Sequence, residues 1–414
     1  GRVCYRERAS QEMGTGMNDR QRELVATVRA IGPAMVERAE RYDREASFPT
    51  ENFADLRDAG FLALCIPESH GGLGADFATY ARGAEEIGRH CGSTALAFNM
   101  HTATTLLTGQ ISDELGLSDA DRQLVGERRE RLYADIVENH TIHAQPFSEG
   151  LDPRATKGFA TMAEPVDGGY RISGRKIFAS LSTSADIHNV ACMVEGDHRI
   201  RLIGIPAGAD GLTVTGEWDP LGMRGTVSKT LEIDNVFVPA DNEWLPPGVF
   251  NQMATRWPHF YMTLSFAYVG VMGAVIDFTG RYLAGEIDGT SRVGNPQKEY
   301  VWADIQVRYE QARSLAHQAA DEAGSDPSPA ALRRAWSSVV STMEGAPAIA
   351  SAAVQACGGR SLLRPLPLER LYRDARCGAT MLPWSAEICR ERLGSLKSGI
   401  EGIAGRDEPT AQEV

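Results

Sequence analysis

The side chains best able to bind metal ions or attack substrates are widely spaced in this 414-residue sequence. Its seven cysteines form no CxxC pair, and no histidine accompanies them at the spacing of a metal site. The histidines, among them His140 and His143, show no metal-ligand pattern of their own. We therefore expect no metal site, and we expect reduced, mostly buried thiols. The cysteines are Cys4, Cys65, Cys91, Cys192, Cys357, Cys377 and Cys389.

A glycine-rich run, GGLG at 71–74, is the nearest approach to a phosphate-binding loop. It lies between two helical patterns, and the lysine of a phosphate loop is missing. No GxGxxG follows a predicted strand either, which disfavours a nucleotide-binding fold of alternating strands and helices. We interpret this run as a structural turn.

The hydrophobic pattern changes twice along the chain and so defines the elements that must position a site. Apolar residues recur at helical spacing over 18–138. Short, alternating, β-branched segments punctuated by Gly, Asp and Pro fill 139–248, and helical spacing returns over 249–414. The pattern predicts an α+β fold: an N-terminal helical domain, a middle β domain and a C-terminal helical bundle. Residues 1–17 are expected to form a disordered tail.

Composition narrows the class of protein. Hydrophobic residues make up 43% and charged residues 23%, as is usual for a globular chain. A net charge of -13 disfavours nonspecific binding to nucleic acid. No apolar run reaches the roughly 18 residues of a membrane helix, and the first residues lack the apolar core of a signal peptide. We expect no nucleic-acid partner, no membrane partner and a cytoplasmic location.

Six motifs in order carry a family resemblance: IPESHGGLGAD, FSEG, GRKIFAS, DPLGMRGTVSKT, QACGGRSLL and LYRDAR. Together with the order helices, strands, helices, they resemble the acyl-CoA dehydrogenase family from about Asn18 to Arg392. The resemblance implies a middle antiparallel β-barrel-like domain, a C-terminal four-helix bundle and FAD as cofactor. Because part of the family's cofactor site is shared between subunits, it also implies a homodimer or homotetramer.

The resemblance assigns four residues to the flavin ring. FSEG matches the family's TEP segment, so Phe147 and Ser148 are expected along the pyrimidine side of the ring. In GRKIFAS, Phe178 takes the place of the family's Trp beside the ring, and Ser180 that of the Thr that bonds to N5. Both substitutions keep the chemistry, an aromatic wall and a hydroxyl, that stabilises a bound flavin.

The resemblance assigns other residues to the ADP part of FAD. QACGG at 355–359 matches the element whose Gln and Gly-Gly backbone approach the cofactor from a neighbouring subunit, here Gln355, Gly358 and Gly359. Arg154 falls on the Ser of the family's GAGSD loop and could bind a phosphate, or it could be a solvated loop residue. The family's RxxFG loop is missing after Gly285, and Arg292 is a candidate to replace its Arg.

The catalytic base of the family is missing. Dehydrogenation needs a carboxylate to remove the α-proton of a thioester, and its two known positions correspond here to Leu382 and Phe260. His259 is the nearest titratable candidate, although a His near the start of an apolar helix is more often structural. The residues expected to line the substrate pocket, with core packing as the alternative, are His101, Tyr261, Met381, Leu382 and Trp384.

Three functions follow from this resemblance. The first is α,β-oxidation of an acyl-CoA or carrier-protein thioester with a non-standard base, with an electron-transfer flavoprotein as electron acceptor. It is favoured slightly because DPLGMRGTVSKT resembles the substrate-side loop of thioester enzymes. The second is a two-component flavin monooxygenase, in which a partner flavin reductase supplies reduced flavin that reacts with oxygen; that branch also lacks the Glu. The third is a non-catalytic flavoprotein.

Overall fold

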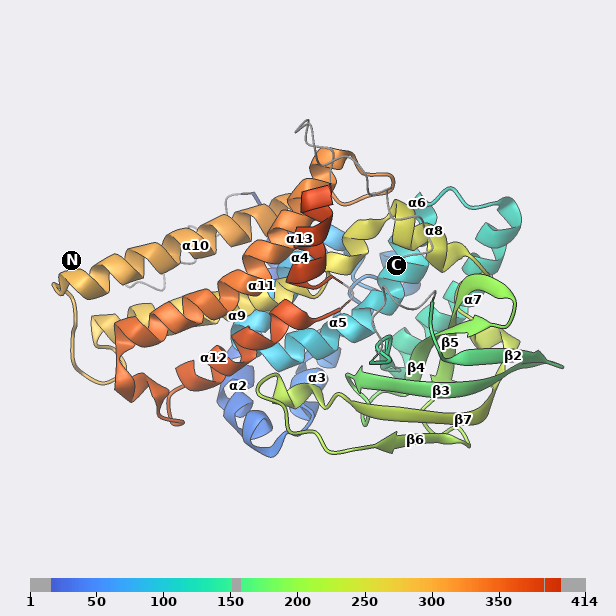
Figure 1. Cartoon of the computed structure of the whole chain (residues 1–414), viewed down its shortest axis with the longest axis horizontal. Helices are drawn as coiled ribbons and strands as arrows, with labels where there is room; N and C mark the ends of the chain where they lie inside the picture. Colours follow the sequence, from blue (N-terminus) through green and yellow to red (C-terminus); the bar gives the residue numbers. More distant parts are fainter. Residues whose placement is uncertain (1–15, 151–157, 383, 396–414) are drawn as a thin grey trace.

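Helices, then a sheet, then helices follow one another in the computed structural model, which describes residues 16–150, 158–382 and 384–395 (Figure 1). This order confirms the fold predicted from the sequence. Figure 1 shows the sheet at the lower right and the long C-terminal helices extending to the left.

The N-terminal helices begin where the sequence offers good caps. The Asn18 side chain accepts a hydrogen bond from the Gln21 backbone N–H, and the Gln21 side chain accepts one from that of Asn18, a reciprocal capping box. The face predicted to be apolar is buried at Leu24, Val28 and Met35. The helices are α2 (Asp19–Glu45), α3 (Thr50–Asp58), α4 (Phe77–His90), α5 (Gly92–Leu106), α6 (Ser112–Glu114) and α7 (Asp119–Asn139).

The GGLG run at 71–74 is a turn between α3 and α4, as predicted. Its backbone donates hydrogen bonds to preceding carbonyls, from Leu73 to Ala63 and from Gly74 to Ile66. The GGLG run is therefore a turn that is hydrogen-bonded to the segment before it, within the N-terminal helical part.

The middle part is one seven-stranded sheet with the order β1-β4-β2-β3-β7-β6, in which β5 pairs with β4. Most pairings are antiparallel, as expected. Two are parallel, β1 with β4 and the single pair Met162–Met193 of β2 with β4. The strands are β1 (His143–Ala144), β2 (Met162–Val166), β3 (Gly169–Ala179), β4 (Ile187–Val194), β5 (Asp197–Pro206), β6 (Leu212–Thr215) and β7 (Lys229–Pro239).

The C-terminal helices pack on the N-terminal ones through a continuous apolar core. The closest approach is that of α4 to α9, where a Cβ on Gly270 would lie 2.2 Å from the Glu85 carbonyl oxygen. Only glycine allows the two backbones to come so near. The helices are α8 (Val249–Arg256), α9 (Ser265–Ala284), α10 (Pro296–Asp321), α11 (Pro329–Cys357), α12 (Leu368–Cys377) and α13 (Ala386–Ser395).

One helical segment of the described chain, Pro258–Ala284, is long and apolar enough to cross a membrane by length and composition. This differs from the expectation that no apolar run is long enough. Of its most apolar window, 89% is buried inside the protein, in contact with α4, α10 and α11. A core helix passes the same test, so the segment is weak evidence for a membrane span.

Candidate active site

The end of β3 is bulged where the aromatic side chain of the predicted flavin site lies. The register with β7 shifts between Lys176 and Ala179, and Phe178 between them has a φ of 51°. A bulge redirects a side chain, and a left-handed aromatic residue persists only where its surroundings hold it. Phe178 is 66% exposed, and its ring lies edge-to-face with that of Trp218, at 6.4 Å between centroids. It is a ring presented outward, able to pack against a planar ligand.

Ser180 follows Phe178 and belongs to a buried chain of three hydroxyl groups. Its Oγ lies 2.8 Å from that of Ser228, which lies 2.8 Å from Oγ1 of Thr226. Four of the eight non-glycine residues with positive φ in the described chain surround this chain: Phe178, Leu181, Met223 and Val227. Strained backbone concentrated around one polar cluster is typical of a functional site.

A buried ion pair holds the Ser148 segment against β3. The Glu149 carboxylate accepts a hydrogen bond from the Lys176 ammonium at 2.6 Å, and both side chains are nearly inaccessible to solvent. Burial alone would raise the pKa of Glu149, but Lys176 and the donors of Ala160 and Thr161 outweigh it and lower the pKa. One residue away on each strand, Ile177 N–H donates to the Ser148 carbonyl at 2.8 Å. Ser148 is thereby fixed beside the bulge.

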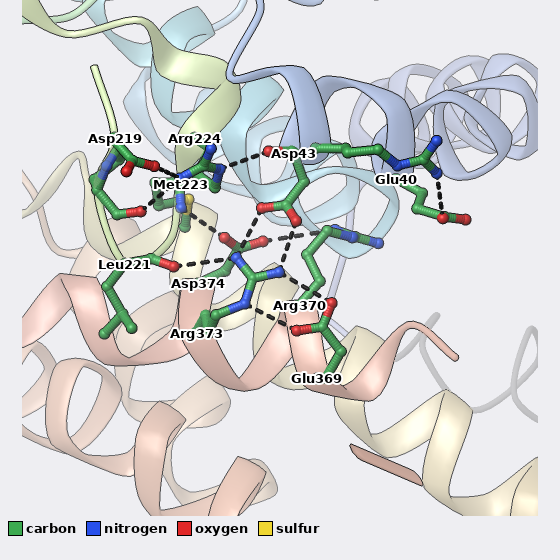
Figure 2. A network of polar contacts seen from close by, with 12 residues as sticks. Glu40, Asp43, Asp219, Leu221, Met223, Arg224, Glu369, Arg370, Arg373 and Asp374 are labelled. Atoms are coloured by element: carbon green, nitrogen blue, oxygen red, sulfur yellow. Dashed lines mark hydrogen bonds and ion pairs between the residues drawn. The ribbon is translucent and has the colours of Figure 1, made fainter. Parts of the chain in front are cut away.

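The loop that carries Thr226 and Ser228 is clamped between α2 and α12 (Figure 2). The Asp374 carboxylate of α12 accepts the Met223 N–H at 2.6 Å, and burial raises its pKa against the opposing effect of Arg370. Arg373 reaches Asp43 of α2 at 2.6 Å and the Leu221 carbonyl at 3.1 Å. A Cβ on Gly222 would lie 2.5 Å from the backbone of α12, so the loop sits directly on that helix.

A second cluster forms where the segment before α13 meets the short helix η6 (Pro258–Met262) before α9. The Tyr261 ring lies 5.7 Å from that of Trp384, and the Tyr268 hydroxyl contacts the Met381 sulfur at 3.3 Å. Four of the five predicted pocket residues are thus on one segment or in contact with it. Leu382, at the usual base position, is 37% exposed, and Phe260, at the alternative one, is buried.

His259 is fully buried with its ring edge-on to Trp257. Neither ring nitrogen makes a hydrogen bond of normal geometry to a described residue. Burial lowers its pKa to about 4, although Glu322 and the Gly324 backbone act in the opposite direction. A histidine that resists protonation at neutral pH is a poor acceptor for a substrate proton.

His101, the fifth predicted pocket residue, belongs to a buried polar network beneath the sheet. Its Nε2 lies 2.7 Å from the Leu62 carbonyl, and its Nδ1 accepts the His143 N–H at 3.1 Å. The network continues through Asn189, whose side chain bonds to Thr104 at 2.9 Å. These hydrogen bonds lead away from the Tyr261–Trp384 cluster, and a role of His101 in the substrate pocket remains a prediction.

Three residues predicted for the ADP part of FAD lie at the end of α11: Gln355, Gly358 and Gly359. Gln355 and Gly359 are exposed, and nothing lies within 4 Å of a Cβ built on Gly358 or Gly359. Arg292 is already engaged, with its guanidinium 2.6 Å from Asp288 and stacked on Tyr282. Arg154 lies outside the described residues. Figure 1 shows the end of α11 at the left and β3 at the lower right, so within one chain these two groups are far apart.

The residues at the β3 bulge fit the ring of a flavin: an outward aromatic ring, an adjacent hydroxyl and a fixed Ser148 segment. Phe178, Ser180 and Ser148 were predicted from the sequence and lie together in the structure, whereas Ser228 and Thr226 were not singled out, although both lie in the motif DPLGMRGTVSKT. Among the described residues, no group of three or more His, Cys, Asp and Glu side chains is placed to hold a metal ion.

Comparison with known proteins identifies the family. Sequence models of the acyl-CoA dehydrogenase N-terminal, middle and C-terminal domains match residues 18–113, 148–236 and 250–390. The putative acyl-CoA dehydrogenase YdbM of Bacillus subtilis is 25% identical over 371 residues, 87% of this chain and 93% of its own. Isovaleryl-CoA dehydrogenase of Arabidopsis thaliana is 26% identical over 353 residues, 82% of this chain and 81% of its own.

Two solved structures share the fold. KijD3 in complex with FMN and a dTDP-linked amino keto sugar is 22% identical, with a TM-score of 0.79 over 97% of this chain and 98% of its own. Dibenzothiophene monooxygenase TdsC from Paenibacillus sp. A11-2 is 20% identical, with a TM-score of 0.75 over 90% and 96%. With the three domains matched in order over most of its length, the chain belongs to the acyl-CoA dehydrogenase family and is a flavin-dependent oxidoreductase.

Proposed function

We propose that this protein is a monooxygenase that uses reduced flavin and molecular oxygen. The observation that carries the proposal is the chemistry at the family's two base positions, where Leu382 and Phe260 stand. Neither side chain can accept a proton, so removal of the α-proton of a thioester has no carboxylate to perform it. Oxygen transfer from a reduced flavin does not need that step.

Nearby titratable groups do not replace the missing carboxylate. Asp374 is buried and already accepts the Met223 N–H, and Asp277 is paired with Arg89 at 2.5 Å. His259 is buried with a pKa near 4. Each of these three groups is either engaged in a hydrogen bond or ion pair or buried away from solvent. None of them can act as the base that dehydrogenation requires.

The same positions suit oxygen chemistry. Phe260, Tyr261 and Trp384 form an apolar, largely dry surface, and such surroundings keep water from a reactive flavin–oxygen species. Bound reduced flavin supplies two electrons and the substrate supplies two. Together they reduce O2, placing one oxygen atom in the product and the other in water. The chain contributes the aromatic wall of Phe178, the hydroxyl of Ser180 and the exclusion of water.

The solved relatives support this choice. TdsC is described as a dibenzothiophene monooxygenase, and both it and KijD3 have been solved with FMN. We keep FAD as the proposed flavin, supported by the open backbone at Gly358 and Gly359 and by the exposed Gln355. FMN is the alternative, because Arg292 is held by Asp288 rather than free to bind a phosphate.

We also propose that two subunits build each cofactor site and that a flavin reductase is the redox partner. Support for the shared site comes from the separation of α11's end and β3 within one chain (Figure 1). A homodimer or homotetramer can bring the Gly358–Gly359 backbone of one subunit to the β3 bulge of another.

The second candidate is acyl-thioester dehydrogenation, favoured by the curated relatives, which carry acyl-CoA dehydrogenase names. An anaerobic experiment separates the two. The protein is loaded with FAD or with FMN and mixed with a panel of acyl-CoAs. We expect no bleaching of the flavin, because Leu382 and Phe260 cannot start the reaction.

The flavin is then reduced by a reductase and exposed to oxygen in a stopped-flow spectrometer. We expect an oxygenated flavin species that is long-lived compared with that of free flavin. Bleaching by an acyl-CoA at a catalytic rate would reject the monooxygenase in favour of the dehydrogenase. Failure to bind either flavin would reject both. The titrations themselves decide between FAD and FMN.

A further inference from the structure

The chain of three hydroxyl groups beside the β3 bulge has one direction that satisfies every hydrogen bond in the structure. It begins at Thr226, whose hydroxyl lies 2.9 Å from the Met223 carbonyl oxygen. A carbonyl oxygen can only accept, so Thr226 must donate its one proton to it. The next contact, 2.8 Å between Thr226 and Ser228, must then be donated by Ser228.

The same reasoning fixes the last hydroxyl. Ser228 donates its only hydroxyl hydrogen to Thr226. In the 2.8 Å hydrogen bond between Ser180 and Ser228, the donor must therefore be Ser180. The Ser180 oxygen is left with lone pairs and no proton to offer. On any side other than that of Ser228, it is a hydrogen-bond acceptor.

The backbone around this chain holds its starting point in place. Met223 is left-handed, its N–H is bonded to the buried Asp374, and its carbonyl also accepts the Thr226 N–H at 3.1 Å. On the other side, the Ser182 hydroxyl donates to the Val227 carbonyl at 2.7 Å. The loop that carries the Met223 carbonyl is thus held by Asp374 at one end and by Ser182 at the other, and this carbonyl sets the direction of the hydroxyls that follow.

We propose that Thr226 and Ser228 are positioning residues that make Ser180 an acceptor and so select the reduced form of the flavin. This inference rests on the proposed function and on the family resemblance, which places Ser180 at flavin N5. That atom carries a hydrogen in reduced flavin and can donate it to Ser180. In oxidised flavin N5 has no hydrogen, and two acceptors face each other.

Binding of the oxidised form requires the chain to reverse. Ser180 would then donate to N5, Ser228 to Ser180 and Thr226 to Ser228, and the hydroxyl bond to the Met223 carbonyl would be lost. One hydrogen bond contributes about 0.5–1.5 kcal/mol, so the chain favours reduced flavin by roughly two- to tenfold.

The test compares dissociation constants for the oxidised and the reduced form of the same flavin, measured anaerobically for the wild-type protein and for variants. Thr226→Val leaves Ser228 without an acceptor there, so that it donates to Ser180 and Ser180 donates outward. We expect the ratio of oxidised to reduced dissociation constants to fall by roughly two- to tenfold. Thr226→Ser keeps the hydroxyl and should keep the wild-type ratio.

The matched control is Thr213→Val, the same change at an exposed position of β6. Damage to the fold weakens the binding of oxidised and reduced flavin alike, so it does not change the ratio of the two dissociation constants. If Thr226→Val does not fold, Ser228→Ala is the second variant, which frees Ser180 to rotate and should bring the ratio down by a smaller factor.

A ratio unchanged by Thr226→Val, or by Ser228→Ala in its place, would overturn the inference. That result is distinguishable from a failure of the proposed function. A protein that forms the oxygenated flavin but shows an unchanged ratio keeps the function and loses the inference. A protein bleached by an acyl-CoA loses the function, whatever its ratio.

Discussion

Lys176 and Glu149 show at the scale of single residues how the site is held. The Lys176 ammonium is completely buried and donates to Glu149 and to the Ala191 carbonyl, both at 2.6 Å. It also lies 4.3 Å above the Phe159 ring. A buried charge is stable only when a counter-charge is present. The ion pair therefore holds the Ser148 segment against β3.

Glu149→Gln should therefore destabilise the protein by roughly 3–5 kcal/mol, because it leaves Lys176 buried without a counter-charge. The measurement is the free energy of unfolding in urea. The control is Glu232→Gln, which breaks the exposed pair with Arg175, the residue next to Lys176. We expect that change to cost less than about 1 kcal/mol. Equal costs for both variants would show that burial of the first pair is not the cause.

The sequence allowed the prediction of single residues only where a motif carried them. Phe178, Ser180 and Ser148 could be proposed from their place in GRKIFAS and FSEG. The bond between Ser180 and Ser228 joins residues 48 positions apart, and it depends on the pairing of β3 with β7 and on a bulge. No local pattern encodes that distance, so the partners of the predicted residues appear only in the structure.

At the scale of elements, the loop at 219–228 is held by helices rather than by its own strands. Figure 2 shows Arg224 and Arg373 converging on Asp43, while Asp374 bonds to Met223. Three segments distant in the sequence, α2, the loop and α12, are tied at one point. The loop that carries Thr226 and Ser228 is therefore attached directly to α12.

Asp374→Ala should loosen this loop. It leaves the buried Met223 N–H without a partner, a loss of about 1–3 kcal/mol. We expect faster amide hydrogen exchange over residues 222–228 and weaker binding of flavin. Asp219→Asn is the control. Asp219 lies in the same loop and pairs with Arg224, but its side chain is 82% exposed. Unchanged exchange in Asp374→Ala would mean that other contacts hold the loop.

The order and type of the elements were predictable because their hydrophobic periods are long and distinct. The strands of the middle part and the helices on either side of it are confirmed. The bulge at Phe178 was not predicted, because neither Phe nor Ala marks a left-handed position in the way that Gly does. The apolar helix α9 was underestimated as a membrane candidate because isolated polar residues interrupt its run.

At the scale of the whole molecule, buried histidines make stability depend on pH. Burial lowers the pKa of His101 to about 4, of His143 to about 3 and of His188 to about 4. In the unfolded chain, histidine titrates near 6.5. Between about pH 6.5 and about pH 4 the unfolded state therefore binds more protons, and the free energy of unfolding must fall as the pH falls.

His188→Leu should make the free energy of unfolding fall less steeply as the pH is lowered. Both ring nitrogens of His188 are buried without a hydrogen-bond partner among the described residues, so leucine leaves no polar group unsatisfied. Within the window, one histidine contributes up to about 1.4 kcal/mol per pH unit. Urea unfolding at several pH values in the window measures the slope. His198→Leu, at an exposed position of β5, should leave the slope as it is. A slope unchanged in His188→Leu would contradict the prediction.

The direction of the hydroxyl chain also has an electrochemical consequence. A protein that binds the reduced form of a two-electron carrier tenfold more tightly than the oxidised form raises the midpoint potential of that carrier by about 30 mV. With Ser180 as an acceptor, bound flavin is a weaker electron donor than free flavin, and the spent, oxidised coenzyme is the form that dissociates more readily. Turnover would then proceed by exchange of flavin with a reductase in each cycle.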